Sequence, residues 1–189
     1  MPAARLVLAA FMLSFLAGCA TTPRDESARV EARAEVREMA QRTLVRLHEL
    51  QPQSRDVIAR AAGYAVFSNF GLKILVAGGG SGQGIVVERG VREVFMRMVE
   101  LQAGLGFGVK QFSLVFVFDS PAALRRFVDS GWEFGGQGTI AASDGVQGGA
   151  VQSAVSVAPG VWVYQLTEKG LAAELTVRGT KYYRDSKLD

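Results

Sequence analysis

Residues 78–84 read Gly-Gly-Gly-Ser-Gly-Gln-Gly, and the apolar run Ile-Val-Val follows directly at 85–87. Glycine alternates through this stretch, and a second alternating run of glycines follows at 104–108. In an extended strand successive residues face opposite sides of the sheet, so each run places its glycines on one face without side chains. Such a face lets another backbone, a helix or a ligand come very close, and it permits sharp strand curvature. The alternating positions of the first run are Gly78, Gly80, Gly82 and Gly84.

Two interpretations of these glycines compete. Close packing of curved strands is favoured, because glycine inside a strand usually marks a bulge or a close approach. Binding of an anion by the exposed backbone amides is the alternative. The run lacks the Lys-Ser/Thr ending of a P-loop, and its preceding strand is not part of a βαβ unit.

Outside the glycines, hydrophobic residues alternate with a period of two from residue 64 onward. Turns are predicted at Arg89-Gly90 and at 168–170. The pattern predicts an α+β fold, with a glycine-rich, mainly antiparallel curved β-sheet or barrel-like core and a few flanking helices. Strands are expected at 64–67, 72–77, 84–88, 92–101, 104–110, 112–118, 146–157, 161–166 and 171–178.

Three helices are expected around this sheet. Residues 28–50 form an amphipathic helix rich in both Arg and Glu, so that it is close to electrically neutral. A short helix follows at 55–62, with Ser54 as its N-cap and Gly63 at its C-terminal end. A third helix runs over 121–128, with Asp119-Ser120-Pro121 at its start.

Two features of the 28–50 helix have open alternatives. Arg29, Arg33 and Arg37 share a face that can meet anionic head groups. A solvated face on a helix that packs its other side on the domain is favoured instead, since Glu31 and nearby acids offset the charge. His48 can act as a proton switch, but a capping or surface role is favoured because it is the one His of the chain.

The composition excludes several classes of protein. A single Cys excludes an internal disulfide and a multi-cysteine metal site, and the single His excludes a histidine-rich one. A net charge of +3 is too small to indicate a nucleic-acid-binding protein. Ser81 does not stand in a G-x-S-x-G motif, and no carboxylate pair lies in an obviously apolar setting. We therefore expect no enzymatic activity, no cofactor and no metal.

The N-terminus has the pattern of an export signal. Arg5 precedes the apolar run 6–16, which is too short to span the ~30 Å hydrocarbon core of a bilayer. The run ends in Leu-Ala-Gly-Cys at 16–19, which resembles the bacterial lipobox, although a buried Cys in an ordinary helix is the alternative. Residues 1–18 are thus the expected lipoprotein signal peptide, Cys19 the lipidated residue and 19–27 the tether. Ala20, in place of Asp, favours transport to the outer membrane.

Several short motifs follow one another in a recognisable order and spacing from residue 61 onward. They are AAGYAVF at 61–67, Lys73, GGGSGQG at 78–84, GLGFGVK at 104–110, VFVF at 115–118, WEFG at 132–135 and VYQLTEKGL at 163–171. Through them, residues 60–185 resemble the SYLF-domain family, whose eukaryotic members are lipid-binding, actin-associated endocytic proteins. The segment 179–183 resembles the close of the bacterial lipoprotein branch. The SYLF-like domain is expected over 51–189.

The resemblance implies a compact, β-rich, non-catalytic domain that binds membrane phospholipid. Lys73 fits the family position for a head-group contact best, Lys110 comes next, and Gly78, Gly80, Gly82 and Gly84 would lie beside them. The alternative is that both lysines are solvated strand ends. The expected protein is an outer-membrane lipoprotein facing the periplasm. Its partners are the membrane, through acylated Cys19, and phospholipid head groups. The actin role is not carried over, because a bacterial envelope offers no actin. An envelope structural or protein-interaction module without a lipid ligand is the alternative.

Overall fold

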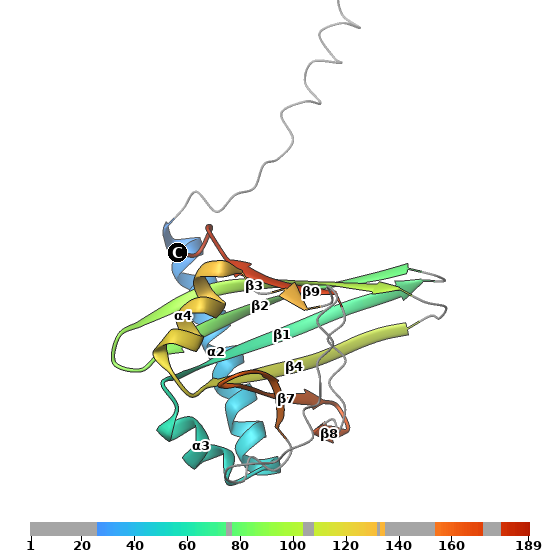
Figure 1. The fold of residues 1–189 in the computed structure, drawn as a ribbon. Helices are drawn as coiled ribbons and strands as arrows, with labels where there is room; N and C mark the ends of the chain where they lie inside the picture. The colour runs from blue at the N-terminus through green and yellow to red at the C-terminus, as the bar shows by residue number, and fades with distance from the viewer. Residues whose placement is uncertain (1–25, 75–76, 104–107, 132, 135–153, 172–178) are drawn as a thin grey trace, which may run out of the picture.

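The computed structural model of the chain describes residues 26–74, 77–103, 108–131, 133–134, 154–171 and 179–189 (Figure 1). The nine strands found among these described residues form one antiparallel sheet in the order β5-β9-β3-β2-β1-β4-β7-β6, with β8 paired to β7. The sheet curls into a half-barrel, which confirms the α+β, curved-sheet prediction. The strands are β1 (Gly63–Ile74), β2 (Ala77–Glu88), β3 (Arg92–Ala103), β4 (Gly108–Phe118), β5 (Glu133–Phe134), β6 (Val155–Ala158), β7 (Val161–Thr167), β8 (Gly170–Leu171) and β9 (Thr180–Arg184).

The central strands are longer than the sequence predicts. Strands were expected at 64–67 and 72–77 and again at 84–88, with the glycines between them, but β1 and β2 each run unbroken for 12 residues. Pairing depends on backbone N–H and C=O groups, which glycine supplies as well as any residue. The register joins Gly84 to Phe67 and Gly82 to Asn69, so the glycine run is part of the ladder.

The first core cluster fills the inner face of the curl, under α4 (Pro121–Ser130). Phe67, Phe116, Phe127 and Tyr182 come from β1, β4, α4 and β9 and meet there, with ring centroids 4.9–6.1 Å apart. Edge-on and tilted pairs of this kind add to the free energy gained by burying the rings. The predicted start of α4 is confirmed, since the Ser120 hydroxyl accepts a hydrogen bond from the Ala123 amide at 3.2 Å.

The second core cluster lies on the outer face of the sheet, under α2 (Glu26–Leu50). Figure 1 shows α2 and α4 on opposite sides of the strands. The buried residues of α2 recur at helical spacing, at Val36, Ala40, Thr43 and Leu47. The helix therefore packs on the domain, as the favoured interpretation expected, but its arginine face is not simply solvated, because Arg33 and Arg37 contact other parts of the protein. None of the helices that the structure describes has the length and apolarity needed to cross a bilayer.

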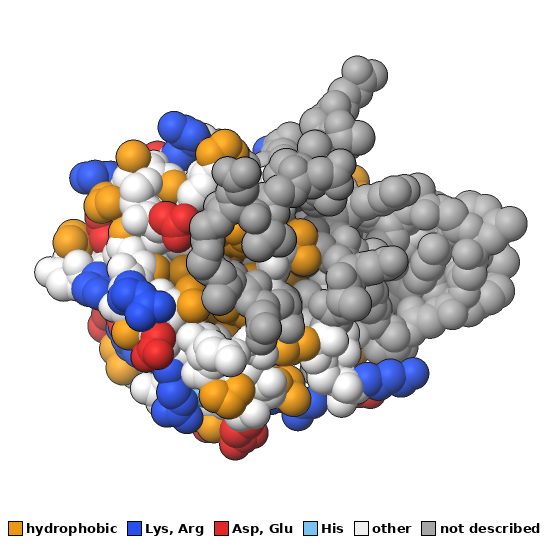
Figure 2. Space-filling model, turned by 60° about the horizontal axis from the view of Figure 1, so that its bottom comes forward, with side chains coloured by type: hydrophobic (Ala, Val, Ile, Leu, Met, Phe, Trp, Pro, Cys, Tyr) orange, Lys and Arg blue, Asp and Glu red, His pale blue; other side chains and the backbone are white. Residues whose placement is uncertain are grey.

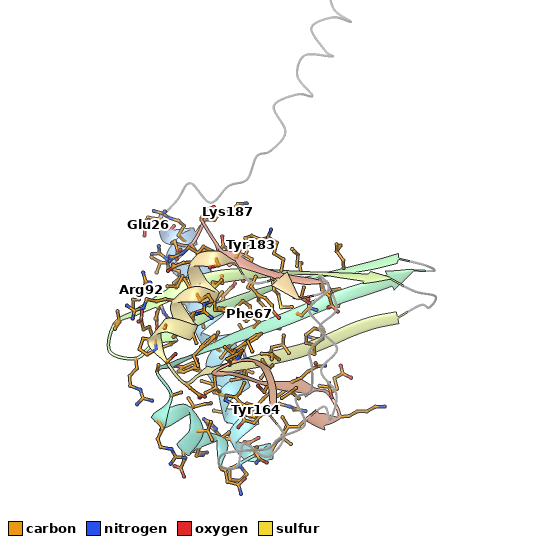
Figure 3. The ribbon with its side chains drawn as sticks, in the orientation of Figure 1. Glu26, Phe67, Arg92, Tyr164, Tyr183 and Lys187 are labelled. Carbon is orange, nitrogen blue, oxygen red and sulfur yellow. The ribbon has the colours of Figure 1, made fainter. Side chains whose placement is uncertain are left out.

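The arginine face of α2 contacts the protein itself. Arg33 donates to the backbone carbonyl of Leu188 at 2.6 Å, and Arg37 donates to the Glu93 carboxylate at 2.8 Å. Both guanidinium groups lie over the Phe95 ring, at 5.9 and 5.2 Å from its centroid. Figure 3 accordingly places Glu26, at the start of α2, beside Lys187 near the C-terminus. These contacts tie the two described ends of the chain together.

The short helix α3 (Ser54–Arg60) corrects two expectations. Ser54 is its first helical residue rather than its N-cap, and Gly63 begins β1 rather than ending the helix. The buried Ser54 hydroxyl instead lies 2.7 Å from His48 Nδ1. Burial, and then the nearby Arg55 charge, lower the pKa of His48 below its usual value.

Several expected elements lie outside the described residues. These are the signal peptide and Cys19, residues 104–107 of the second glycine run, most of the strand at 146–157 and most of the strand at 171–178.

Replacing Gly84 with Ala should destabilise the protein. A Cβ at this position would overlap the Phe67 ring and lie 2.6 Å from the Val66 carbonyl oxygen. Overpacking of this kind costs about 1–3 kcal/mol of unfolding free energy, measured by urea denaturation. Gly79→Ala is the matched control, because its nearest contact is the Glu100 carbonyl oxygen at an ordinary 3.5 Å. Equal stability of the two variants would contradict the packing role of Gly84.

Candidate functional site

The sheet brings together two lysine positions that are 37 residues apart in the chain. Lys73 in β1 pairs with Gly108 of β4, and Lys110 in β4 pairs with Gly71 of β1. The two positions are therefore diagonal neighbours in one ladder, a relationship that separates residues by about 7–8 Å. The sequence singled out both lysines through the family resemblance, and β1–β4 pairing is what makes them neighbours.

Glycines frame both lysine positions on the neighbouring strands. The row through Lys73 reads Gly78–Lys73–Gly108 across β2, β1 and β4. The next row reads Gly80–Gly71–Lys110 across the same strands. Within these rows, the strand neighbours of both lysine positions are glycines and carry no Cβ atom. We refer to these two rows as the lysine–glycine site.

The other two predicted glycines of this group lie deeper in the fold. A Cβ at Gly82 would lie 2.8 Å from Met98 Cγ, and Gly84 is covered by the Phe67 ring. Both glycines therefore allow close packing within the core. The four glycines thus divide by place, with Gly78 and Gly80 in the lysine–glycine site and Gly82 and Gly84 against the core. Lipid binding at any of the four stays a prediction.

A buried carboxylate lies in the same row as Lys110. Glu100 of β3 pairs with Gly80 and is only 2% exposed. The buried Asn69 amide donates a hydrogen bond to its carboxylate at 2.6 Å. Burial, and then the Glu100 charge, raise the pKa of Tyr182 well above its usual value. A buried carboxylate is costly without hydrogen bonds, so the Asn69 amide stabilises Glu100 at this position.

The sequence contained a signal for Glu100 that composition could not show. In β3 the residues on the inner face alternate as Val94, Met96, Met98 and Glu100, so an acid continues an otherwise apolar series. Two neighbouring polar atoms are also buried, namely Asn69 Oδ1 and Thr180 Oγ1. Neither has a hydrogen-bond partner in the part of the chain that the structure describes.

The side chains that could act as nucleophiles, acids or bases lie apart from one another or are engaged with other residues. Ser81 is exposed on β2, and His48 is engaged with Ser54. Asp119 accepts a hydrogen bond from the Trp162 indole at 3.1 Å, and Asp129 pairs with Arg184 at 2.7 Å. Within the described ranges, no three His, Cys, Asp or Glu side chains are grouped so that they could hold a metal ion.

The fold and this site define a class of protein, a glycine-rich curled antiparallel sheet closed by one inner and one outer helix. Residues 99–189 match the Ysc84 family model, described as Las17-binding protein actin regulator and built on the SYLF domain. The chain is also 30% identical over 160 residues to Beta cell expansion factor A of Aeromonas veronii. That match covers 84% of this chain and 59% of the relative, so the chain spans little more than half the relative's length. The chain belongs to the SYLF-domain family, as its motifs predicted.

Removing the amide donor of the buried acid should destabilise the fold. Asn69→Ala leaves the Glu100 carboxylate without this hydrogen bond, at a cost of about 1–3 kcal/mol in unfolding free energy. The cost is read from the midpoint of urea denaturation. Ser68→Ala, one residue away on the opposite face, is the control and should change stability by less than about 0.5 kcal/mol. A stable Asn69→Ala variant would mean that Glu100 is not held by Asn69.

Proposed function

We propose that this protein is an outer-membrane lipoprotein whose non-catalytic SYLF domain binds phospholipid from the periplasmic side. The observation that carries the proposal is the lysine–glycine site, in which Lys73 and Lys110 become diagonal neighbours between glycines. Family membership supports lipid binding, since this is the property that the resemblance implies.

The chemistry of the site suits an anionic head group. Lysine is a flexible, compact point charge, and two lysines at diagonal positions can reach one phosphate. Each lysine near an anionic surface contributes about 1 kcal/mol to binding. The glycine rows remove the side chains that would hold a head group away from the backbone. Glu100, the acid in the Lys110 row, is already engaged by Asn69.

Anchoring through Cys19 would keep the domain at the membrane. More than one acyl chain is needed for stable attachment, and a lipidated N-terminal Cys supplies that. Residues 19–25 separate the Cys from the start of α2, and fully extended they span at most about 25 Å. The domain would therefore act on lipid close to its own anchor, and the affinity of a single site could be modest.

The rest of the described surface carries mixed charges, so it would not attract anionic membranes as a whole. Figure 2 shows one face of the molecule, and on its described part Lys and Arg side chains are interspersed with Asp and Glu. Net charge is also small, at +3 for the whole chain. Electrostatic binding would then depend on a few placed lysines, and it would weaken as salt screens them.

The lysine pair can be tested by vesicle binding. A Cys19→Ala protein without residues 1–18 should sediment with vesicles containing phosphatidylglycerol more than with pure phosphatidylcholine vesicles. Lys73→Ala and Lys110→Ala should each weaken this binding by about fivefold at low salt. Lys187→Ala, an exposed lysine at the C-terminus, is the matched control and should bind as the parent does. Unchanged binding in the double lysine variant would refute the site, and no binding to any vesicle would favour a protein-interaction role.

The anchor can be tested separately in cells. Replacing Cys19 with Ser should abolish incorporation of labelled palmitate and shift the protein out of the outer-membrane fraction. Ala20→Asp should keep the palmitate label but move the protein to the inner membrane. Palmitate labelling that survives in Cys19→Ser would show that Cys19 is not the lipidated residue.

A further inference from the structure

A trough runs along the flank of α2 on the outer face of the sheet. It consists of two hollows of about 340 and 350 Å³, which meet at Ser68. Thr43 and Arg46 of α2 line one hollow, and Glu35 and Met39 line the other. Figure 1 shows that β1 to β4 continue well past the point where α2 crosses them. The trough therefore lies where the helix stops covering the sheet.

The floor of the trough is a polar row across four strands. Gln83 pairs with Arg97 on one side and with Ser68 on the other, and Ser68 pairs with Ser113. At about 4.8 Å per strand, this row is about 14 Å long. The neighbouring row on the same face, under α2, is apolar and buried: Phe95, Ile85, Val66 and Val115. The face thus changes from apolar to polar at the edge of the helix.

The polar side chains of the trough have unused hydrogen-bonding capacity. Serine and glutamine side chains each both donate and accept. Five such side chains make no side-chain hydrogen bond to any other described residue of the chain: Ser68, Ser81, Gln83, Gln111 and Ser113.

An exposed aromatic ring stands among these groups. Phe70 is 58% exposed, lines one hollow and pairs with Ser81 on one side and Gln111 on the other. The face of a phenyl ring is electron-rich and attracts polarised C–H groups. A ring flanked on both sides by hydroxyl and amide groups offers an apolar platform with hydrogen bonds at its edges.

The charges that line the trough are balanced, and both arginines are engaged. Arg97 lies 3.7 Å from Asp185, and Arg46 donates to the backbone carbonyls of Thr167 and Glu168 at 3.3 and 3.1 Å. Two acids, Glu35 and Glu168, also line the hollows and balance the charge of the two arginines. An anionic ligand therefore gains little here, whereas an uncharged polar ligand avoids the cost of burying a charge.

We propose that this trough binds an uncharged linear oligosaccharide. A sugar chain carries hydroxyl and amide groups that both donate and accept, and each ring has a C–H face that can stack on Phe70. The length of the polar row suits an extended chain rather than a single small group. This inference goes beyond the phospholipid-binding proposal and does not depend on it, because it uses neither Lys73 nor Lys110.

The test is a titration of the ¹⁵N-labelled protein with triacetylchitotriose, followed by NMR. Saturable shifts should appear at the amides of Ser68, Gln83 and Ser113. Phe70→Ala and Gln83→Ala should each weaken binding by about three- to tenfold, as expected for loss of one stacking or hydrogen-bonding contact. Val91→Ala removes another exposed apolar side chain, at the β2–β3 turn, and should bind as the parent does.

Other outcomes would overturn the proposal. These are no saturable binding up to about 10 mM sugar, shifts confined to another surface, or full affinity in Phe70→Ala. Shifts of the same row by phosphatidylglycerol vesicles, with none from the sugar, would assign the trough to lipid instead. Phe70 and Gln83 are exposed, so unchanged thermal unfolding of both variants shows that lost binding is not lost folding.

Discussion

The packing of Phe67 against the glycines of β2 is the constraint on which the rest of the structure depends. Gly84 has no side chain, and this lets the Phe67 ring lie against β2 and meet Phe127 of α4 and Tyr182 of β9. A Cβ at Gly84 would displace that ring and the cluster around it. The glycines thus let a strand, a helix and a distant C-terminal strand share one inner core.

The same absence of side chains has a different consequence further along β2. At Gly78 and Gly80 the neighbouring positions in the ladder are Lys73 and Gly71, not core aromatics. The glycine run therefore differs along its length, with Gly82 and Gly84 packed against the core and Gly78 and Gly80 beside the two lysine positions. On the opposite face the change from apolar to polar rows occurs between Ile85 and Gln83, one ladder step apart. Both candidate sites lie beyond the part of the sheet that the helices cover.

Helix ends and turns were predicted correctly where a single residue has a local physical role. Ser120 caps α4 through its own hydroxyl, and Gly90 has a positive φ of 69° in the β2–β3 turn. Ser54 is not an N-cap, because α3 begins at Ser54 itself, and its hydroxyl lies against His48 of α2. The broken strands around residues 78–84 were predicted from side-chain patterning, to which glycine contributes nothing. Pairing of backbone groups between neighbouring strands decided that they are continuous.

The sequence by itself determined the family, the curved antiparallel sheet and the two lysines worth testing, because periodicity and motif order are encoded along the chain. Tertiary structure alone decided that α2 packs on the outer face, with Arg33 and Arg37 tied to Leu188 and Glu93. It also decided that Glu100 is buried beside Asn69 and that polar groups of four strands line up beside Phe70. These features depend on strand register, which aligns residues far apart in sequence and which no single segment specifies.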